Sequence, residues 1–266
     1  MFDCFNRNIN YLRVSVTDRC NYRCTYCMPE EGVKLLSHSD ILSFDEIVNV
    51  VSFGVKQGIT KVRITGGEPL VRKGIVELIG MIASIKGIQD LSMTTNGKLL
   101  TELAESLKNA GLQRVNISLD TLDPERFRQI TRVGELKEVL QGIEAAKKAG
   151  LTPIKLNCVI KKSNLETDAK LVAQYAKENN LEVRYIHEMD LKKGSFSVVE
   201  GGEGGNCSKC NRLRLTANGN LKPCLFSNLE FNVRELGIEK AFELALTQKP
   251  KSGHRNSTGD FYNIGG

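Results

Sequence analysis

The sequence predicts an α/β fold, namely an incomplete TIM-like barrel of six βα units with a small C-terminal region. Short β-branched runs alternate with amphipathic helical windows, which is the pattern of βα units around a parallel sheet. Most of the strand-like runs also carry one polar face. The length of 266 residues, with 41% hydrophobic and 26% charged residues, allows one large core. No apolar run approaches the ~20 residues that a membrane span needs.

Each element is marked by its residue pattern. The predicted strands cover residues 11–16, 61–65, 91–95, 115–119, 154–159 and 183–188. The predicted helices between them cover residues 45–56, 73–85, 100–110, 137–149 and 166–179. Ser43 and Glu46 form a capping-box pattern at the first helix. Gly58, Gly111 and Gly150 follow helices at positions where a left-handed cap is expected.

The polar strand faces predict a cavity inside the barrel. A closed eight-stranded barrel fills its interior with branched aliphatic side chains, so six strands with polar faces indicate an open barrel with a wet interior. Five cations are expected to point into it: Arg13, Lys61, Arg63, Lys155 and Arg184. These cations would repel each other, so an anionic ligand is expected, and a polyphosphate fits best. The alternative is that they form structural salt bridges with Glu68, Asp120 and Glu188.

Three cysteines lie on one loop after the first strand, at C-x3-C-x2-C spacing: Cys20, Cys24 and Cys27. Three thiolates on a tight loop can hold three irons of a [4Fe–4S] cube and leave the fourth iron open. An open iron beside Tyr26 suits S-adenosylmethionine, which chelates metal and supplies radical chemistry. A zinc knuckle that borrows a distant Cys or His is the alternative. Eight cysteines without a secretion signal predict a cytoplasmic protein with metal or redox chemistry.

A glycine-rich run at 201–205 predicts a flexible linker. We therefore expect a partial barrel at 1–190, a linker at 191–206 and an auxiliary iron–sulfur region with a C-terminal tail at 207–266. That last region holds a second triad, Cys207, Cys210 and Cys224. A zinc ribbon with Cys158 or His254 as fourth ligand is the alternative. A helix expected at 232–246 carries the apolar set Leu236, Phe242 and Leu246, which would cover the second triad.

Taken together, the motifs resemble the GTP 3′,8-cyclases, radical S-adenosylmethionine (SAM) enzymes of molybdenum-cofactor biosynthesis. The resemblance covers most of the chain. It is carried by residues 11–20, the first cysteine loop, 63–69, 95–97, 118–120, the second triad with 211–214, and the terminal Gly265 and Gly266. There is one departure, because only residues 191–206 separate the sixth strand from the second triad, where family members have a longer stretch.

The resemblance implies a role for individual residues. The first triad would hold the reducing [4Fe–4S] cluster, and the second triad an auxiliary [4Fe–4S] cluster that meets the guanine. SAM would be contacted by Tyr26, Gly67, Ser118 and Met189. GTP would be contacted by Arg13, Arg63, Thr94, Lys155, Arg212 and Arg214, with Lys61 and Arg184 as further cations around the triphosphate. Gly265 and Gly266 would enter the active site as part of the catalytic apparatus.

The same resemblance implies the reaction and the partners. GTP would be converted to 3′,8-cyclo-7,8-dihydro-GTP, with electrons from a flavodoxin- or ferredoxin-like donor and a pyranopterin synthase downstream. A homodimer is compatible with it. The net charge of +6 is spread along the chain, so no nucleic acid is expected as a partner. The alternatives are a radical SAM enzyme for another anionic substrate, or a non-catalytic zinc-containing nucleotide-binding protein.

Overall fold

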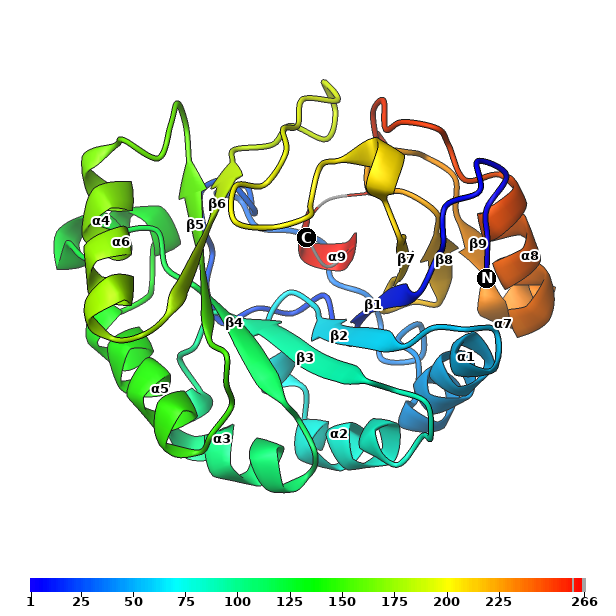
Figure 1. Ribbon diagram of the computed structural model, residues 1–266, viewed down its shortest axis with the longest axis horizontal. Coiled ribbons are helices and arrows are strands. Elements are labelled where there is room, and N and C mark those ends of the chain that lie inside the picture. The colour runs from blue at the N-terminus through cyan, green and yellow to red at the C-terminus, as the bar shows by residue number, and fades with distance from the viewer. Residues whose placement is uncertain (260, 265–266) are drawn as a thin grey trace.

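The computed structural model describes residues 1–259 and 261–264, which form a curved sheet flanked by helices (Figure 1). Within these residues the sheet has nine strands in the order β6-β5-β4-β3-β2-β1-β7-β8-β9. The seven strands from β6 to β7 run parallel, while β8 and β9 are antiparallel additions. The sheet is not closed into a barrel, as the sequence predicted.

The strand bounds are β1 Tyr11–Ser15, β2 Lys61–Thr65, β3 Asp90–Thr95, β4 Arg114–Ser118, β5 Lys155–Ile160, β6 Glu182–His187, β7 Arg212–Leu215, β8 Asn220–Lys222 and β9 Phe231–Asn232. The α-helices are α1 Phe44–Lys56, α2 Ile75–Ala83, α3 Leu100–Asn109, α4 Pro124–Thr131, α5 Leu136–Lys148, α6 Thr167–Glu178, α7 Val233–Leu236, α8 Ile238–Thr247 and α9 Phe261–Ile264. There are also two short 3-10 helices in the described residues. Pro69–Val71 follows the glycine-rich turn after β2, and Cys207–Lys209 begins at the first cysteine of the second triad.

All six predicted strands and the five helices between them are present, but the sequence reasoning missed several elements. Helix α4 begins at Pro124 after Asp123, whose carboxylate accepts hydrogen bonds from the first turn. That Asp-Pro start is a recognisable helix signal. The strands β7 to β9 were also missed, because two to four residues are too few to show a period.

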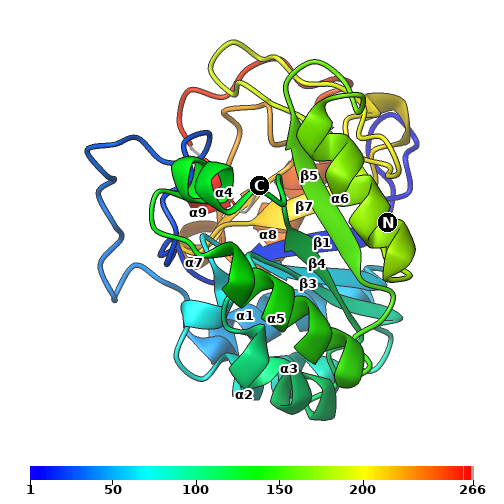
Figure 2. The same cartoon turned by 90° about the vertical axis from the view of Figure 1, so that its left-hand side faces the viewer.

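The helices cover one side of the sheet. Helices α2, α3 and α5 lie on its convex side, and long loops lie on the other (Figure 2). Side chains that point toward the helices are fully buried, including Leu12, Val14, Val62 and Ile64. The predicted apolar faces of β1 and β2 are therefore correct, and their polar faces are turned to the inside of the curve.

The C-terminal helical window differs from the prediction. Gly237 has a φ of 79° and separates α7 from α8, so the expected single helix is two. Phe242 packs on Phe53 of α1 with ring centroids 5.2 Å apart, whereas Leu236 is 44% exposed. The prediction that this helix covers the second triad is wrong, because its apolar face packs against α1 and the strands β8 and β9.

The residues after β6 pack back against the sheet. Residues 185 and 200, and 190 and 195, form isolated antiparallel bridges, so the glycine-rich run is folded back beside β6. Strand β7 then pairs with β1 and continues the parallel sheet. The division at 190 and 207 stays a prediction about domains. The sheet itself is continuous across it.

A matched pair of glycines tests the packing of α5 on the sheet. A methyl group at Gly142 would overlap the carbonyl oxygen of Gly97, whereas one at Gly80 of α2 meets no heavy atom within 4 Å. We expect Gly142→Ala to lower the free energy of unfolding by about 1–3 kcal/mol, since a packed contact must open. Gly80→Ala should raise it by about 0.5–1 kcal/mol, because alanine favours a helix. Thermal unfolding of both variants measures this, and equal Tm values would contradict it.

Candidate active site

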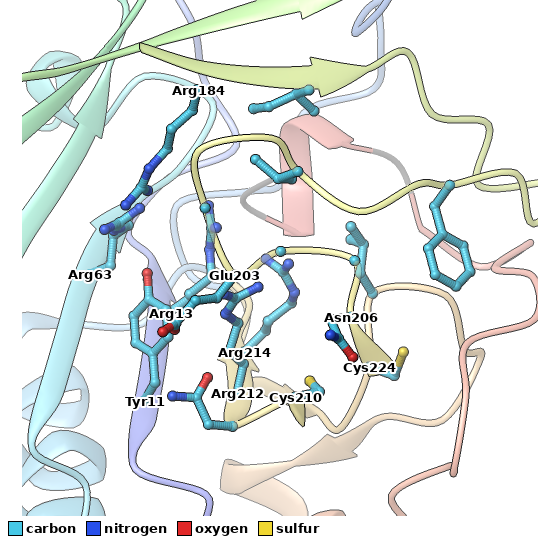
Figure 3. A pocket seen from close by; sticks show the side chains of 18 of the residues that line it. Tyr11, Arg13, Arg63, Arg184, Glu203, Asn206, Cys210, Arg212, Arg214 and Cys224 are labelled. Atoms are coloured by element: carbon cyan, nitrogen blue, oxygen red, sulfur yellow. The ribbon is translucent and has the colours of Figure 1, made fainter. Parts of the chain in front are cut away.

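Two adjoining cavities lie on the inner side of the sheet. The larger has a volume of about 420 Å³ and contains arginines and the second triad (Figure 3). The smaller has a volume of about 210 Å³ and is lined by the first triad. Four residues line both: Thr94, Asn157, Ile186 and Met189. The volume of the larger cavity is within the range of small-molecule sites, and a ligand bound there would lie next to the smaller cavity.

Strand register places three arginines side by side in the larger cavity. Arg13 of β1 is aligned with Arg63 of β2 on one side and with Arg214 of β7 on the other. Because aligned residues of neighbouring strands point to the same face, these guanidinium groups share one wall. Two residues earlier on β1, and therefore on the same face, Tyr11 is aligned with Lys61 and Arg212. Arg184 enters from β6 (Figure 3).

The field in this cavity is strongly positive. Burial, followed by the charge of Arg214, holds the pKa of Arg13 well below its usual range. Burial and the charge of Arg212 lower the pKa of Arg214 to about 10. Arginine does not give up its proton in proteins, so an anion beside these guanidinium groups would be stabilised. The positive charge of the cavity is thus suited to an anionic ligand.

Tyr11 is a site residue that the sequence reasoning did not single out. Its ring lies 5.6 Å from the guanidinium carbon of Arg63 and 5.4 Å from that of Arg212. Burial would raise the pKa of Tyr11, yet the neighbouring arginines lower it on balance. Its hydroxyl is buried with no hydrogen-bond partner among the described residues. The ring therefore fixes two arginines by cation–π contact, and the hydroxyl remains available to a ligand.

Lys155 differs from its prediction. It lies on the same face of β5 as Asn157, but it does not line either described cavity and forms an ion pair with Glu182. Its charge is compensated within the sheet, because register brings those two residues together. Arg114, which was not predicted, does line the larger cavity and pairs with Asp90 at 2.6 Å. The other predicted cations, Arg13, Lys61, Arg63, Arg184, Arg212 and Arg214, all line it.

The first triad is held by the glycine-rich turn after β2. The backbone nitrogens of Gly67 and Glu68 donate to the carbonyl oxygens of Thr17 and Arg19 at 2.8 Å each. A Cβ atom at Gly67 would overlap the backbone of Arg19, so only glycine allows the two segments to approach this closely. This pairing fixes the chain just before Cys20. Cys20, Cys24 and Cys27 then line the smaller cavity together.

The four residues predicted to contact SAM also line the smaller cavity: Tyr26, Gly67, Ser118 and Met189. The hydroxyl of Tyr26 donates to Asp120 at 2.9 Å, and the backbone nitrogen of Val159 donates to the same carboxylate. Burial raises the pKa of Asp120 to about 6. This hydrogen bond fixes the ring of Tyr26 beside the cysteine loop.

Glu68 and Asp120 do not neutralise the cavity cations, so the alternative of structural salt bridges is wrong for both. Glu68 accepts hydrogen bonds from Thr95, Asn96 and Leu70, and it organises the turn after β2. Burial raises the pKa of Glu68 to about 7 against these donors. Carboxylates in the smaller cavity and cations in the larger one give the two compartments different chemistry.

The second triad, Cys207, Cys210 and Cys224, lines the larger cavity. Figure 3 shows Cys210 and Cys224 on the side of the cavity opposite Arg63 and Arg184. Among residues 1–259 and 261–264, no three His, Cys, Asp or Glu side chains gather as the ligands of one metal ion do. A [4Fe–4S] cube takes each thiolate on a separate iron, so its ligands surround the cube. Cys158 cannot join this triad, because it is buried and directed to Asp120.

Two predicted site residues, Gly265 and Gly266, lie outside the described residues. The helix α9 directly precedes them. Its residue Ile264 is 1% exposed and packs with Leu191, Leu225 and Phe226. Phe261 lines the smaller cavity. Helix α9 lies within the opening of the curved sheet (Figure 1).

Family models match most of the chain. The model of the radical SAM superfamily matches residues 14–174, and that of Molybdenum Cofactor Synthesis C matches residues 135–255. Solved structures agree on the fold. SuiB of Streptococcus suis with S-adenosylmethionine gives a TM-score of 0.64 at 15% identity, over 92% of this chain and 65% of that one. The enzyme anSMEcpe with AdoMet gives 0.65 at 17% identity, over 90% and 81%.

Curated relatives are more similar in sequence. GTP 3′,8-cyclase of Thermodesulfovibrio yellowstonii is 44% identical over 282 residues, which covers 89% of this chain and 88% of that protein. GTP 3′,8-cyclase of Alkaliphilus oremlandii is 39% identical over 320 residues and covers 100% of both chains. Since this chain has 266 residues, about 54 of those 320 aligned positions are gaps in it, in agreement with the predicted shortening. The chain is thus a member of the GTP 3′,8-cyclase family of radical SAM enzymes.

Proposed function

We propose that this chain converts GTP to 3′,8-cyclo-7,8-dihydro-GTP, using SAM and two [4Fe–4S] clusters. One observation carries the proposal. The arginine-lined cavity and the cavity of the first cysteine triad share the lining residues Thr94, Asn157 and Met189, so the two cavities are neighbours. A polyphosphate bound by the arginines would bring its sugar to the compartment of the radical cofactor.

The first triad and the residues around it fit a cluster with SAM. Cys20, Cys24 and Cys27 would hold the cluster, and Tyr26, Gly67, Ser118 and Met189 would contact SAM. When bound, this group supplies a carbon-centred radical that removes hydrogen from the ribose C3′ of GTP. The protein orients the two ligands and holds them apart from water and from oxidisable side chains.

The larger cavity supplies the substrate contacts. Arg63, Arg184 and Arg212 have no carboxylate ion partner in the described part of the chain, and Nε of Arg184 and Arg212 is buried without a hydrogen-bond partner. Triphosphate oxygens would satisfy these donors with charge-assisted hydrogen bonds. Arg13, Lys61 and Arg214 line the same cavity. At its other side the second triad would hold the auxiliary cluster next to the guanine.

The electrons come from outside the chain in this proposal. A flavodoxin- or ferredoxin-like protein would reduce the first cluster, and a pyranopterin synthase would take the product onward. All eight cysteines are free thiols, as a reducing compartment such as the cytoplasm requires. No helix in the described residues is long and apolar enough to cross a membrane.

The cavity cations provide a first test. Arg63→Ala should weaken GTP binding by about 10- to 100-fold, because a charge-assisted contact to phosphate is worth about 1.5–3 kcal/mol. Guanosine binding should hardly change. Lys155→Ala is the matched control, since Lys155 is paired with Glu182 and should have a much smaller effect. Anaerobic calorimetry measures the affinities of the wild type and both variants for GTP and guanosine. Equal GTP affinity of Arg63→Ala and the wild type would show that the arginine is structural.

The first triad provides a second test. Cys24→Ala should reduce the iron of anaerobically reconstituted protein from about eight to about four per chain and abolish cleavage of SAM. Cys158→Ala, which removes a buried thiol outside both triads, should retain iron and cleavage. Iron analysis and the yield of 5′-deoxyadenosine measure the two properties. Stoichiometric zinc with little iron in wild-type protein kept from oxygen would contradict the radical chemistry and support the zinc-containing alternative.

The C-terminal glycines provide a third test. Deletion of Gly265 and Gly266 should abolish formation of the cyclic product and leave iron content and GTP affinity nearly unchanged. The reason is that Ile264 is already anchored beside the cavities, so the glycines extend from a fixed point. Product analysis under single-turnover conditions measures it. Full activity of the shortened chain would show that the tail has no part in the reaction.

A further inference from the structure

Two lysines of the C-terminal region are almost fully buried, and only one of them has an acidic partner. Lys222 is 1% exposed and forms an ion pair with Glu230 at 3.0 Å. Lys249 is 3% exposed, and its Nζ donates to the carbonyl oxygens of Arg212, at 2.8 Å, and Pro223. No carboxylate pairs with it within residues 1–259 and 261–264. A buried cation without a counter-charge costs several kcal/mol, so its position needs an explanation.

The surroundings of Lys249 are the cysteines of the second triad. The carbonyl of Pro223 directly precedes Cys224, and that of Arg212 lies two residues after Cys210. Both carbonyls therefore place the ammonium group of Lys249 next to the backbone that carries Cys210 and Cys224. Burial lowers the pKa of Lys249, and the nearby Cys210 and Cys224 oppose this. The three cysteines line the larger cavity, whereas Lys249 does not.

A second cation fixes the same region without adding uncompensated charge. Arg7 donates to the carbonyl oxygens of Cys207 at 2.8 Å, Pro250 at 2.8 Å and Lys251 at 3.0 Å. Its charge is balanced by Asp3 at 2.6 Å. The segment that carries Lys249 is thereby tied to the first cysteine of the triad. Lys249 has no carboxylate partner in the described part of the chain, so the nearby thiolates can balance its charge.

We propose that Lys249 is a positioning residue for the second cluster, which it holds by fixing Cys210 and Cys224 and by balancing the negative charge of the cluster and its thiolates. The inference rests on the proposed function, in which this triad binds a [4Fe–4S] group. A fixed positive charge at a buried cluster stabilises its reduced, more negative form. Lys249 therefore raises the reduction potential of the second cluster and strengthens its retention.

The test isolates the second cluster in the full-length chain by carrying Cys24→Ala throughout. Lys249→Gln keeps amide donors for the two carbonyls but removes the charge, and Lys249→Met removes both. Lys249→Arg restores the charge, and Lys251→Met removes an exposed charge two residues away. Redox titration followed by electron paramagnetic resonance gives the potential, and iron release to a chelator gives the retention.

We expect the Gln and Met variants to have a lower potential and about 10- to 100-fold weaker retention, as is typical when a group supporting metal ligands is lost. The Arg and Lys251→Met variants should match the parent. If Lys249→Met fails to fold, Lys249→Gln decides. An unchanged potential and retention in Lys249→Gln would overturn the role of Lys249 alone. A Cys24→Ala parent that binds no iron would overturn the second cluster, and this inference with it.

Discussion

The structure depends on a cluster of buried guanidinium groups that lie side by side on neighbouring strands. Strand register aligns Arg214, Arg13 and Arg63 on three neighbouring strands, and Tyr11 contacts two arginines of the same wall. The arginines repel one another, and the burial of the opposite, hydrophobic face of the same strands offsets this repulsion. Leu12, Val14 and Ile64 are fully buried on that face. The burial of that apolar core stabilises the strands strongly enough to keep these positive charges close together.

Short backbone contacts connect the two cysteine triads to the strands that carry the arginines. The turn after β2 ends one of the arginine strands and also fixes the segment before Cys20 through Gly67 and Glu68. Strand β7 carries Arg212 and Arg214, begins two residues after Cys210 and pairs with β1. Each cysteine triad is therefore positioned by strands that also carry arginines of the larger cavity.

The sequence predicted the six barrel strands, the open barrel and most of the arginine wall, because alternation along a strand reports its two faces directly. It did not predict that Lys155 is neutralised, since its partner Glu182 is brought beside it only by strand pairing. The roles of Tyr11 and Lys249 were missed for the same reason, as their partners are distant in sequence. The error at Leu236 and Phe242 came from reading a continuous helix through Gly237.

The central claim is that one chain brings a radical source and a nucleoside triphosphate together across a shared wall. Anaerobic incubation of the reconstituted protein with GTP, SAM and dithionite, with chromatographic and mass analysis of both products, tests it most directly. One hydrogen leaves the ribose and one electron and one proton return, so the account predicts a cyclic isomer of GTP and an equal amount of 5′-deoxyadenosine. Formation of 5′-deoxyadenosine without any GTP-derived isomer would contradict it and indicate a different anionic substrate.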